Sequence, residues 1–549
     1  MKRVPSPAIQ DAINRWLAPP DEVNCLDNIH ERHCGCLTNT ADLLEIGARW
    51  DDLIHIQDGS LTVSFADIVC SADRFAVTLA QHGVNRGDRV FIHGRNSAAW
   101  VAAVWGVWRA AAVPVLGNPS WTREEVRHAL TVTTSQFAVV DSSLMDRLPS
   151  GAQRWSMDDI DFDEKHVDDS WSRLLDDRAR EVAANDAAAV VFTSGTTEFA
   201  KAAVLTHRTF ALNLQGFLAL TGKTDRVMRR EPAPTALITA PLFHIGGIHG
   251  VVRSLVEGSK RIFLSGRFDA GEVLRILETE RIRSLFLVPT ALTRLLSHPD
   301  FAHRDLSSLR SATLGAAPVP PSLLEQLRTA IPSLKVGVNT GYGLTEAGGA
   351  VTAASGADVA ARPGTAGRAL PWAEIRIDNP DEQGGGEIAV RSGAQMLGYL
   401  TPNGLAEEPA KSGGWVMTGD LGRIDDDGFL WVEGRSKDII IRGGENISAA
   451  RVEAVLHAHP AVLEAAAVGL RDAEWGEVVA VVVRASSGDI DEQELVDHAS
   501  TLLARFEIPA HWRIVREPLP TNAMGKILKR ELLQLFEDRP SIDTRPAMT

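Results

Sequence analysis

The sequence predicts an α/β protein: a large domain of parallel-rich sheets covered by helices and carrying a β-rich subdomain, followed by a small α+β domain. Three observations predict this class. Strand-like and helix-like segments alternate through the first half of the 549-residue chain, and short alternating runs with many glycines follow Gly364. A last strand-and-helix region has the size of a separate domain of about 110 residues. A chain of this length has room for at least two domains.

The first half carries the alternation. A short strand in LTVSF precedes a helix of period 3.6 over Phe65–Gln81, and a strand then ends at Ile92. Further elements are expected as a helix over Ala98–Ala112 and strands ending at Asp141, over Ala187–Thr193 and over Leu285–Val288. Strands joined by helices favour a mostly parallel sheet covered on both faces. Residues 143–185, rich in Asp and Arg, show no clear period and are expected to form a surface connection.

The second half changes character beyond Gly364. GRIDDDGFLWVEGR is typical of a hairpin that turns at Asp427 and Gly428. The last region contains an apolar strand and a helix over Asp491–Ala504. We therefore expect four segments: a leader (1–40), a large domain (41–436), a small domain (437–536) and a tail (537–549) with little to bury, expected to be disordered.

Composition excludes several classes of protein. Acidic residues outnumber basic ones 71 to 56, giving a formal net charge of -15, so a broad basic surface for nucleic acid is not expected. The four cysteines are too few and too crowded to staple the chain, which indicates a reducing cytoplasm. The N-terminus lacks the apolar core of a signal peptide. The most apolar stretch, Ala98–Val115, contains Arg109 and Pro114, so a buried helix is expected there rather than a membrane span.

The leader gathers five thiol and imidazole side chains that suit zinc. They lie within twelve residues: Cys25, His30, His33, Cys34 and Cys36. The spacing matches no standard tetrahedral module, so incidental thiols are the favoured interpretation and a metal site is the alternative.

A hydroxyl-rich segment follows the apolar strand that ends at Thr193. It consists of Thr193, Ser194, Gly195, Thr196 and Thr197, with Lys201 four residues further on. Hydroxyls, exposed backbone N–H groups and an ammonium supply the donors that a chain of phosphate oxygens needs. Alone, the segment is equally compatible with a Ser/Thr-rich turn, and it is not a Walker loop.

Eight short motifs remove most of that ambiguity. In chain order they are TSGTTEFAK, PLFH, GAAPV, NTGYGLTE, TGD, GRSKD, GGEN and PTNAMGK. Together they resemble the adenylate-forming superfamily of acyl-CoA synthetases, peptide-synthetase adenylation domains and luciferases, over roughly Ala41 to Leu535. The resemblance implies the adenylate-forming fold, with an active site between a large N-terminal domain and a mobile C-terminal lid. It also implies a reaction in which a carboxylate and ATP give an acyl-adenylate and pyrophosphate, followed by thioester formation with CoA.

The resemblance also implies site residues. The ATP and AMP site would comprise Thr193, Ser194, Gly195, Thr196, Thr197, Lys201, Gly315, Ala316, Ala317, Gly341, Tyr342, Gly343, Thr345, Asp420, Arg435 and Lys526. Within this set the loop from Thr193 to Lys201 holds the β- and γ-phosphates, and Tyr342 faces the adenine. Asp420, an acceptor-only carboxylate, binds the ribose hydroxyls with Arg435 as its partner.

The catalytic set implied by the resemblance is Lys526, Thr345, Glu346 and His244. Lys526 would bridge the carboxylate and the α-phosphate, with Lys529 as a control, and Thr345 offers a hydroxyl to the α-phosphate. Glu346 would bind Mg²⁺, since hard cations prefer oxygen ligands. Outside this context, a Thr-Glu pair is more typical of a helix N-terminus, and a histidine at a strand end is more often structural.

The remaining assignments concern the acyl group and CoA. Phe243, His244, Ile245, Gly246 and Gly247 are expected to shape an acyl pocket, which predicts an apolar acid. Lys437 is the implied hinge. Its movement would bring Arg442, Gly443, Gly444 and Glu445 to the site, where the glycines let the pantetheine arm pass close to the backbone.

The phosphate loop departs from the family pattern, because Glu198 stands where glycine is usual. A carboxylate about 4 Å from a phosphate charge costs roughly 1 kcal/mol in water and roughly 4 kcal/mol at an effective dielectric near 20. If Glu198 faces the triphosphate, Glu198→Gly lowers the KM for ATP. The alternative, which we favour, is that Glu198 points to solvent.

Three functions are compatible with the sequence. The favoured one is an acyl-CoA synthetase that uses a carboxylic acid, ATP, Mg²⁺ and CoA. The second is a standalone adenylating enzyme that passes the acyl group to a carrier protein or an amine. The third is a non-catalytic acyl-nucleotide sensor, against which the retention of Lys526, Asp420, Arg435 and Glu346 argues. The sequence leaves open which acid is used, and whether the protein is a monomer or a homodimer.

Overall fold

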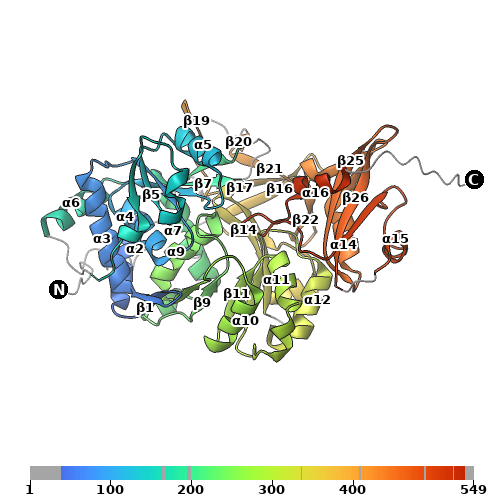
Figure 1. Cartoon of the computed structure of the whole chain (residues 1–549), viewed down its shortest axis with the longest axis horizontal. Helices are drawn as coiled ribbons and strands as arrows, with labels where there is room; N and C mark the ends of the chain where they lie inside the picture. Colours follow the sequence, from blue (N-terminus) through green and yellow to red (C-terminus); the bar gives the residue numbers. More distant parts are fainter. Residues whose placement is uncertain are drawn as a thin grey trace, which may run out of the picture.

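The computed structural model describes residues 39–163, 169–193, 199–334, 337–406, 410–411, 413–486, 490–523 and 525–537. Five sheets organise them, four in the large N-terminal part and one in the C-terminal region, which lies at one end of the molecule (Figure 1). The chain is of the α/β class predicted from the sequence. Residues 1–38, which include the five Cys and His residues of the leader, and residues 538–549 of the tail lie outside the described residues. The expectations for them stay predictions.

The largest sheet has eight strands in the order β19-β18-β8-β7-β4-β3-β5-β6. The strands are β3 (Arg89–His93), β4 (Val113–Gly117), β5 (Phe137–Val140), β6 (Gln153–Ser156), β7 (Ala187–Thr193), β8 (Lys201–Thr206), β18 (Gly398–Thr401) and β19 (Gly404–Ala406). The run from β6 to β7 is parallel, whereas β7, β8, β18 and β19 pair antiparallel. The expected parallel pairing is thus confirmed for β3 to β7, the first five strands of this sheet along the chain.

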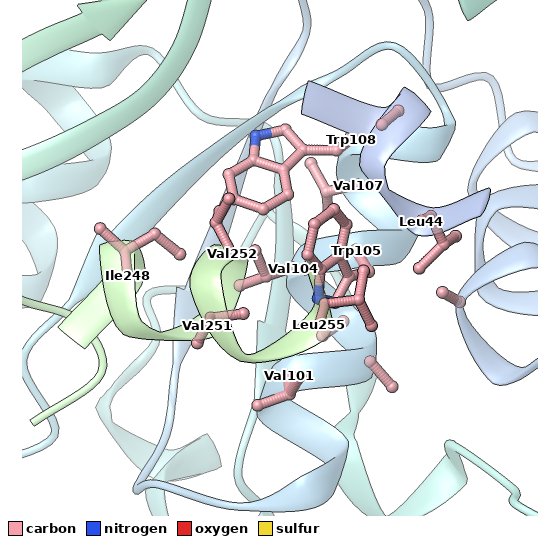
Figure 2. Packing of buried hydrophobic residues seen from close by; sticks show 14 of the residues in the cluster. Leu44, Val101, Val104, Trp105, Val107, Trp108, Ile248, Val251, Val252 and Leu255 are labelled. Atoms are coloured by element: carbon pink, nitrogen blue, oxygen red, sulfur yellow. The ribbon is translucent and has the colours of Figure 1, made fainter. Parts of the chain in front are cut away.

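Helices cover both faces of this sheet. α3 (Phe65–Gln81) and α4 (Ala98–Arg109) pack on one face and α5 (Arg123–Thr133) on the other. α3 has the predicted bounds because Ser64 and Asp67 form a reciprocal capping box, while residues spaced three or four apart, such as Ile68, Ala72 and Phe75, are buried. α2 (Leu43–Gly47) and α9 (Ile245–Glu257) also contribute to the core of α3 and α4. Figure 2 shows Val251 and Leu255 of α9 beside Val104 and Trp105 of α4.

α4 is buried on all sides, as expected, but ends at Arg109 rather than Ala112, because Ala111 takes a positive φ of 58° ahead of β4. The Arg109 guanidinium is buried and pairs with Asp73 at 2.8 Å and with Asp176. Two carboxylates thus offset the cost of burying the charge inside an apolar helix. Among the described residues, no helix has both the length and the apolar character needed to cross a bilayer.

The interpretation of residues 143–185 as a surface connection is wrong in part. β6 forms an edge of the large sheet, and α6 (Asp169–Arg180) packs against α3 and supplies Asp176. α6 escaped prediction because charged residues dominate the segment, although Trp171, Leu175 and Ala179 recur at the four-residue spacing of a helix.

Two smaller sheets complete the first half of the large part. One is β2 (Leu61–Ser64), β1 (Ile54–Asp58), β10 (Arg261–Phe263) and β9 (Ala236–Ile238), and the other is β11 (Ser284–Leu287), β12 (Ser311–Leu314), β13 (Val338–Leu344), β14 (Gly349–Ala354) and β15 (Arg368–Ala369). α10 (Ala270–Thr279), α11 (Pro289–Leu296), α12 (Pro321–Ala330) and α13 (Gly356–Ala361) share a second core, whereas α7 (His207–Leu220) and α8 (Thr224–Met228) pack into the core of α3 and α4.

The predicted β-rich subdomain is the fourth sheet. Its strands are β16 (Ala373–Asp378), β17 (Gly386–Ser392), β20 (Ala410–Lys411), β21 (Trp415–Ile424) and β22 (Leu430–Arg435). The hairpin between β21 and β22 turns through Asp427 and Gly428 as expected, with Gly428 at φ +81°.

The C-terminal region, called the lid below (residues 437–536), has its own sheet and core. It contains β23 (Ile439–Arg442), β24 (Glu445–Ser448), β25 (Val462–Asp472), β26 (Gly476–Ala485), β27 (His511–Val515), α14 (Ala449–His457), α15 (Glu492–Ser500) and α16 (Lys529–Glu537). α15 is shorter than the predicted Asp491–Ala504. α14 starts at Ala449 because the Ser448 hydroxyl accepts the N–H of Arg451 as an N-cap.

Candidate active site

The deepest part of the candidate site is a carboxylate held by two neighbours. Asp420 on β21 and Arg435 on β22 are direct cross-strand partners, and Arg435 Nε lies 3.0 Å from Asp420 Oδ1. The Tyr342 hydroxyl donates to Asp420 Oδ2 at 2.6 Å. Burial and the Asp420 charge raise the pKa of Tyr342 well above its usual value, so the phenol keeps its proton. The two groups predicted to reach one ribose are therefore side by side, and Tyr342 holds the same carboxylate.

A second carboxylate lies at the tip of the β13–β14 hairpin. Thr345 and Glu346 open a 3-10 turn (Thr345–Ala347) between the two strands. The hairpin is tight: a side-chain carbon on Gly343 would lie 2.4 Å from the Gly349 carbonyl oxygen, so only glycine fits. Glu346 Oε1 accepts a hydrogen bond from the Tyr399 hydroxyl at 2.7 Å. Within the described part of the chain, Glu346 Oε2 has no hydrogen bond or ion pair.

The strand-end segment Gly315, Ala316 and Ala317 lies beside this hairpin. β12 pairs with β13, which brings Gly315 next to Gly341. Ala316 is exposed and adopts φ +67°, a left-handed conformation that favours glycine. The backbone thus keeps the shape of a glycine position although the residue is alanine.

His244 precedes α9 as its N-cap residue and makes no side-chain cap. Burial, and secondarily the charge of Lys526, lowers the pKa of His244 to about 4. The imidazole is therefore neutral at pH 7. Gly246 has open space where a side chain would project, whereas Gly247 packs against the Pro241 backbone and Phe243 belongs to the main core. The acyl-pocket role of these residues stays a prediction.

Lys526 reaches the site from the lid. It lies on a tight turn in which Asn522 Oδ1 accepts the Lys526 N–H at 3.0 Å and Thr521 bridges to Ile527. Burial is the main cause that lowers the pKa of Lys526; Arg435 lowers it further, whereas the charges of Asp420 and Glu346 oppose this shift. The Lys526 ammonium is thus within electrostatic reach of both site carboxylates.

Contacts between the lid and the large part fix this placement. The Thr290 hydroxyl on α11 donates to the Gly525 carbonyl at 2.7 Å. Arg294 Nε, also on α11, lies 3.3 Å from Glu464 Oε1 on β25, a carboxylate that is almost fully buried. One helix of the large part therefore holds both the Lys526 turn and the lid sheet.

The predicted CoA residues are elsewhere in this arrangement. Gly443 and Gly444 form the two-residue turn between β23 and β24, with φ values of +59° and +94°, and Arg442 pairs with Glu445 across it. The turn contacts the lid itself, since the Gly443 N–H donates to the Trp475 carbonyl at 2.8 Å. The predicted hinge, Lys437, lies in the short turn Ser436–Asp438 that joins β22 to β23.

Most of the predicted phosphate loop lies outside the described residues: Ser194, Gly195, Thr196, Thr197 and Glu198. Its flanks are described, with Thr193 ending β7 and Lys201 opening β8 as antiparallel partners. The Lys201 ammonium lies 5.1 Å from the centre of the Tyr399 ring.

The donor set fits Mg²⁺ bound with few protein ligands. Among the described residues, no group of three or more His, Cys, Asp or Glu side chains forms a metal cluster. Glu346 offers a carboxylate, and magnesium usually completes its shell with phosphate oxygens and water.

Two residues of this region escaped the sequence analysis, namely Tyr399 and Thr290. Tyr399 lies in the segment GYL, which matches no phosphate or metal motif. The sequence offered one signal, namely that the chain has only two tyrosines. In the structure, both of their hydroxyls donate to site carboxylates.

Comparison with known proteins agrees with this geometry. Residues 45–400 match the family described as AMP-binding enzyme, and residues 451–526 match the AMP-binding enzyme C-terminal domain. The chain belongs to the AMP-binding enzyme family. This confirms the superfamily resemblance of the motifs.

Curated relatives of this AMP-binding enzyme are CoA ligases. The chain is 30% identical over 486 residues to the long-chain-fatty-acid–CoA ligase FadD13 of Mycobacterium tuberculosis, covering 86% of this chain and 93% of that one. It is 32% identical over 499 residues to feruloyl-CoA synthase of Amycolatopsis sp., covering 88% and 95%.

Solved structures give the same fold. The o-succinylbenzoate CoA synthetase MenE of Bacillus subtilis, in complex with its acyl-adenylate intermediate, superposes with a TM-score of 0.72 at 29% identity, covering 92% of this chain and 99% of that one. The same enzyme with ATP and magnesium ion gives a TM-score of 0.74 at 30% identity, covering 89% and 99%.

Proposed function

We propose that this protein is an AMP-forming acyl-CoA synthetase that activates an apolar carboxylic acid with ATP and transfers the acyl group to CoA. The observation that carries the proposal is the placement of Lys526. The charge of Lys526, a lysine from the lid, interacts with those of Asp420, Arg435 and Glu346, where a cation would be needed when an acyl carboxylate meets the α-phosphate. The relatives, which are named as CoA ligases, support the same reaction.

The chemistry assigned to the chain begins with two anions that repel each other. Asp420, oriented by Arg435 and Tyr342, would accept the ribose hydroxyls and fix the nucleotide. Lys526 would neutralise charge between the carboxylate and the α-phosphate as the mixed anhydride forms. Glu346 would hold Mg²⁺, which when bound neutralises phosphate charge. His244, neutral at pH 7, can lie beside the acid without a charge of its own.

The second half-reaction needs the other face of the lid. A rotation at the turn containing Lys437 would withdraw Lys526 and bring the Gly443–Gly444 turn to the acyl-adenylate. The division into a large domain (41–436) and a lid (437–536) is part of this proposal, supported by the separate lid core. A cytoplasmic location is proposed from the sparse cysteines.

An apolar acid is proposed because α9 offers room beside the reaction centre. Gly246 and Gly250, one turn apart on α9, both have open space where a side chain would project. Small residues on a helix face next to His244 leave volume for a bulky acyl group.

A substrate panel tests the proposal. The protein is incubated with ATP, Mg²⁺, CoA and aliphatic, aromatic or alicyclic acids, and acyl-AMP and acyl-CoA are detected by mass. At least one apolar acid should give both products. Acyl-AMP without acyl-CoA would instead favour an enzyme that loads a carrier protein or an amine, and neither product from any acid would favour a nucleotide sensor.

A further inference from the structure

Tyr399 contacts groups on both sides of the proposed phosphate site. It lies on β18, which pairs with β8 and so places the residue opposite Ala203, close to where the phosphate loop rejoins the sheet. Its hydroxyl donates to Glu346 Oε1 at 2.7 Å. The side chain thus connects the large sheet to the β13–β14 hairpin that carries the proposed metal carboxylate.

The same side chain meets both flanks of the phosphate loop. Thr193, the last residue of β7, lies close enough to the phenol for its side chain to oppose the rise of the Tyr399 pKa. The Lys201 ammonium, at the start of β8, lies over the ring at 5.1 Å from its centre, within the range of cation–π attraction. The residues that bracket the loop are therefore joined through one phenol to Glu346.

The phenol supplies a hydroxyl to Glu346 and a ring face to Lys201 from one side chain. A phenol keeps its proton at neutral pH, so the Tyr399 hydroxyl is the donor in its hydrogen bond to Glu346 Oε1. A donated hydrogen bond fixes one carboxylate oxygen and leaves Oε2 for a cation. The ring face, meanwhile, holds the lysine that the phosphates would attract.

We propose that Tyr399 is a positioning residue that orients Glu346 for Mg²⁺ and aligns Thr193 and Lys201 with it, so that metal and triphosphate bind as one unit. The inference rests on the proposed function, since it assigns a role within the same ATP site. It concerns a residue that touches Glu346 rather than the reacting atoms.

Two substitutions separate the hydroxyl from the ring. Tyr399→Phe keeps the ring over Lys201 and removes the hydrogen bond. Because hydrogen bonds to charged groups are among the stronger ones, the Mg²⁺ concentration that gives half-maximal acyl-AMP formation should rise about tenfold. The KM for the carboxylic acid should stay within about twofold. Tyr399→Leu also removes the cation–π contact and should raise the KM for ATP by a further factor of about three.

A spectroscopic readout follows the residue without turnover. Because the chain has only two tyrosines, 3-fluorotyrosine labelling gives two ¹⁹F resonances, and the one missing in Tyr399→Phe belongs to Tyr399. Mg²⁺ added to the ATP complex should shift the Tyr399 resonance more than that of Tyr342. AMP without Mg²⁺ should shift chiefly the Tyr342 resonance, through Asp420.

Tyr342→Phe is the matched control, since it removes the other phenol hydroxyl of the site. It should raise the KM for ATP while leaving the Mg²⁺ dependence unchanged. The inference is overturned if Tyr399→Phe leaves the Mg²⁺ dependence within twofold of the wild type, or if Mg²⁺ fails to move the Tyr399 resonance. Either outcome in an enzyme that still makes acyl-CoA removes the role of Tyr399 and leaves the proposed function standing.

Discussion

Ala316 adopts a backbone conformation that favours glycine, which costs stability. Its φ of +67° is unfavourable for alanine. Ala316→Gly should therefore stabilise the protein by about 0.5 to 1 kcal/mol, after allowing for the greater entropy of glycine in the unfolded chain. Urea unfolding measures this. Ala317→Gly, one residue along and without a positive φ, should destabilise instead, and equal effects of the two changes would contradict the argument.

His244 offers a pH-dependent test at the same scale. Its folded pKa of about 4 lies below the unfolded value near 6.5, so its contribution to stability is complete above pH 6.5 and is lost as the pH falls toward 4. Lys526→Ala removes the nearby positive charge and should raise the His244 pKa, though burial keeps it below 6.5. NMR titration of the imidazole measures the shift. An unchanged pKa would mean that the Lys526 turn does not occupy this position in solution.

At the scale of elements, one hydroxyl of α11 holds the turn that carries Lys526. Thr290→Val removes the hydrogen bond to the Gly525 carbonyl. Because one such bond contributes about 1 kcal/mol, its loss should slow acyl-AMP formation about fivefold. Conversion of supplied acyl-AMP to acyl-CoA should change less, because that step does not need this placement. Thr293→Val is the control, since the Thr293 hydroxyl donates, within the described residues, only to the Pro289 carbonyl of its own helix. Equal slowing by both variants would point to damage to α11 itself.

The β23–β24 hairpin should show the opposite pattern. Gly444 has open space around it but a φ of +94°, so any side chain brings strain and only a large one brings bulk. Gly444→Trp should block acyl-CoA formation while acyl-AMP still accumulates. Gly444→Ala carries the strain alone and should retain most acyl-CoA formation. If the tryptophan variant makes acyl-CoA at the wild-type rate, CoA does not pass this turn.

The elements show where sequence reasoning succeeds. α3 was predicted with its exact bounds, because an amphipathic period and a capping box agree. Asp420 and Arg435 were expected to meet because a hairpin lies between them. α6 was missed because its few apolar residues, although at helical spacing, lie in a segment dominated by charges. Tyr399 was missed because its role depends on β18 pairing with β8, a contact made across about 200 residues of chain that local patterns do not encode.

At the scale of the whole molecule, the proposed reaction requires the lid to adopt two orientations relative to the large part. The structure has Lys526 in the site and the Gly443–Gly444 turn among lid residues. Because Thr290, Arg294 and Lys526 act only in this arrangement, changes to them should affect one half-reaction, and changes at the hairpin the other. Lys529, expected to serve as a control for Lys526, instead pairs with the half-buried Glu453 at 2.7 Å. The exposed Arg530 is the better control.

The most direct test of the account measures both half-reactions in Lys526→Ala, with Arg530→Ala beside it. Acyl-AMP formation should fall by about two orders of magnitude or more, as expected when an electrostatic contact to the transition state is lost. Conversion of supplied acyl-AMP to acyl-CoA should stay within about threefold of the wild type, since Lys526 would then be withdrawn. Equal loss in both half-reactions, or a full rate of acyl-AMP formation, would contradict the central claim that the lid delivers Lys526 for adenylation alone.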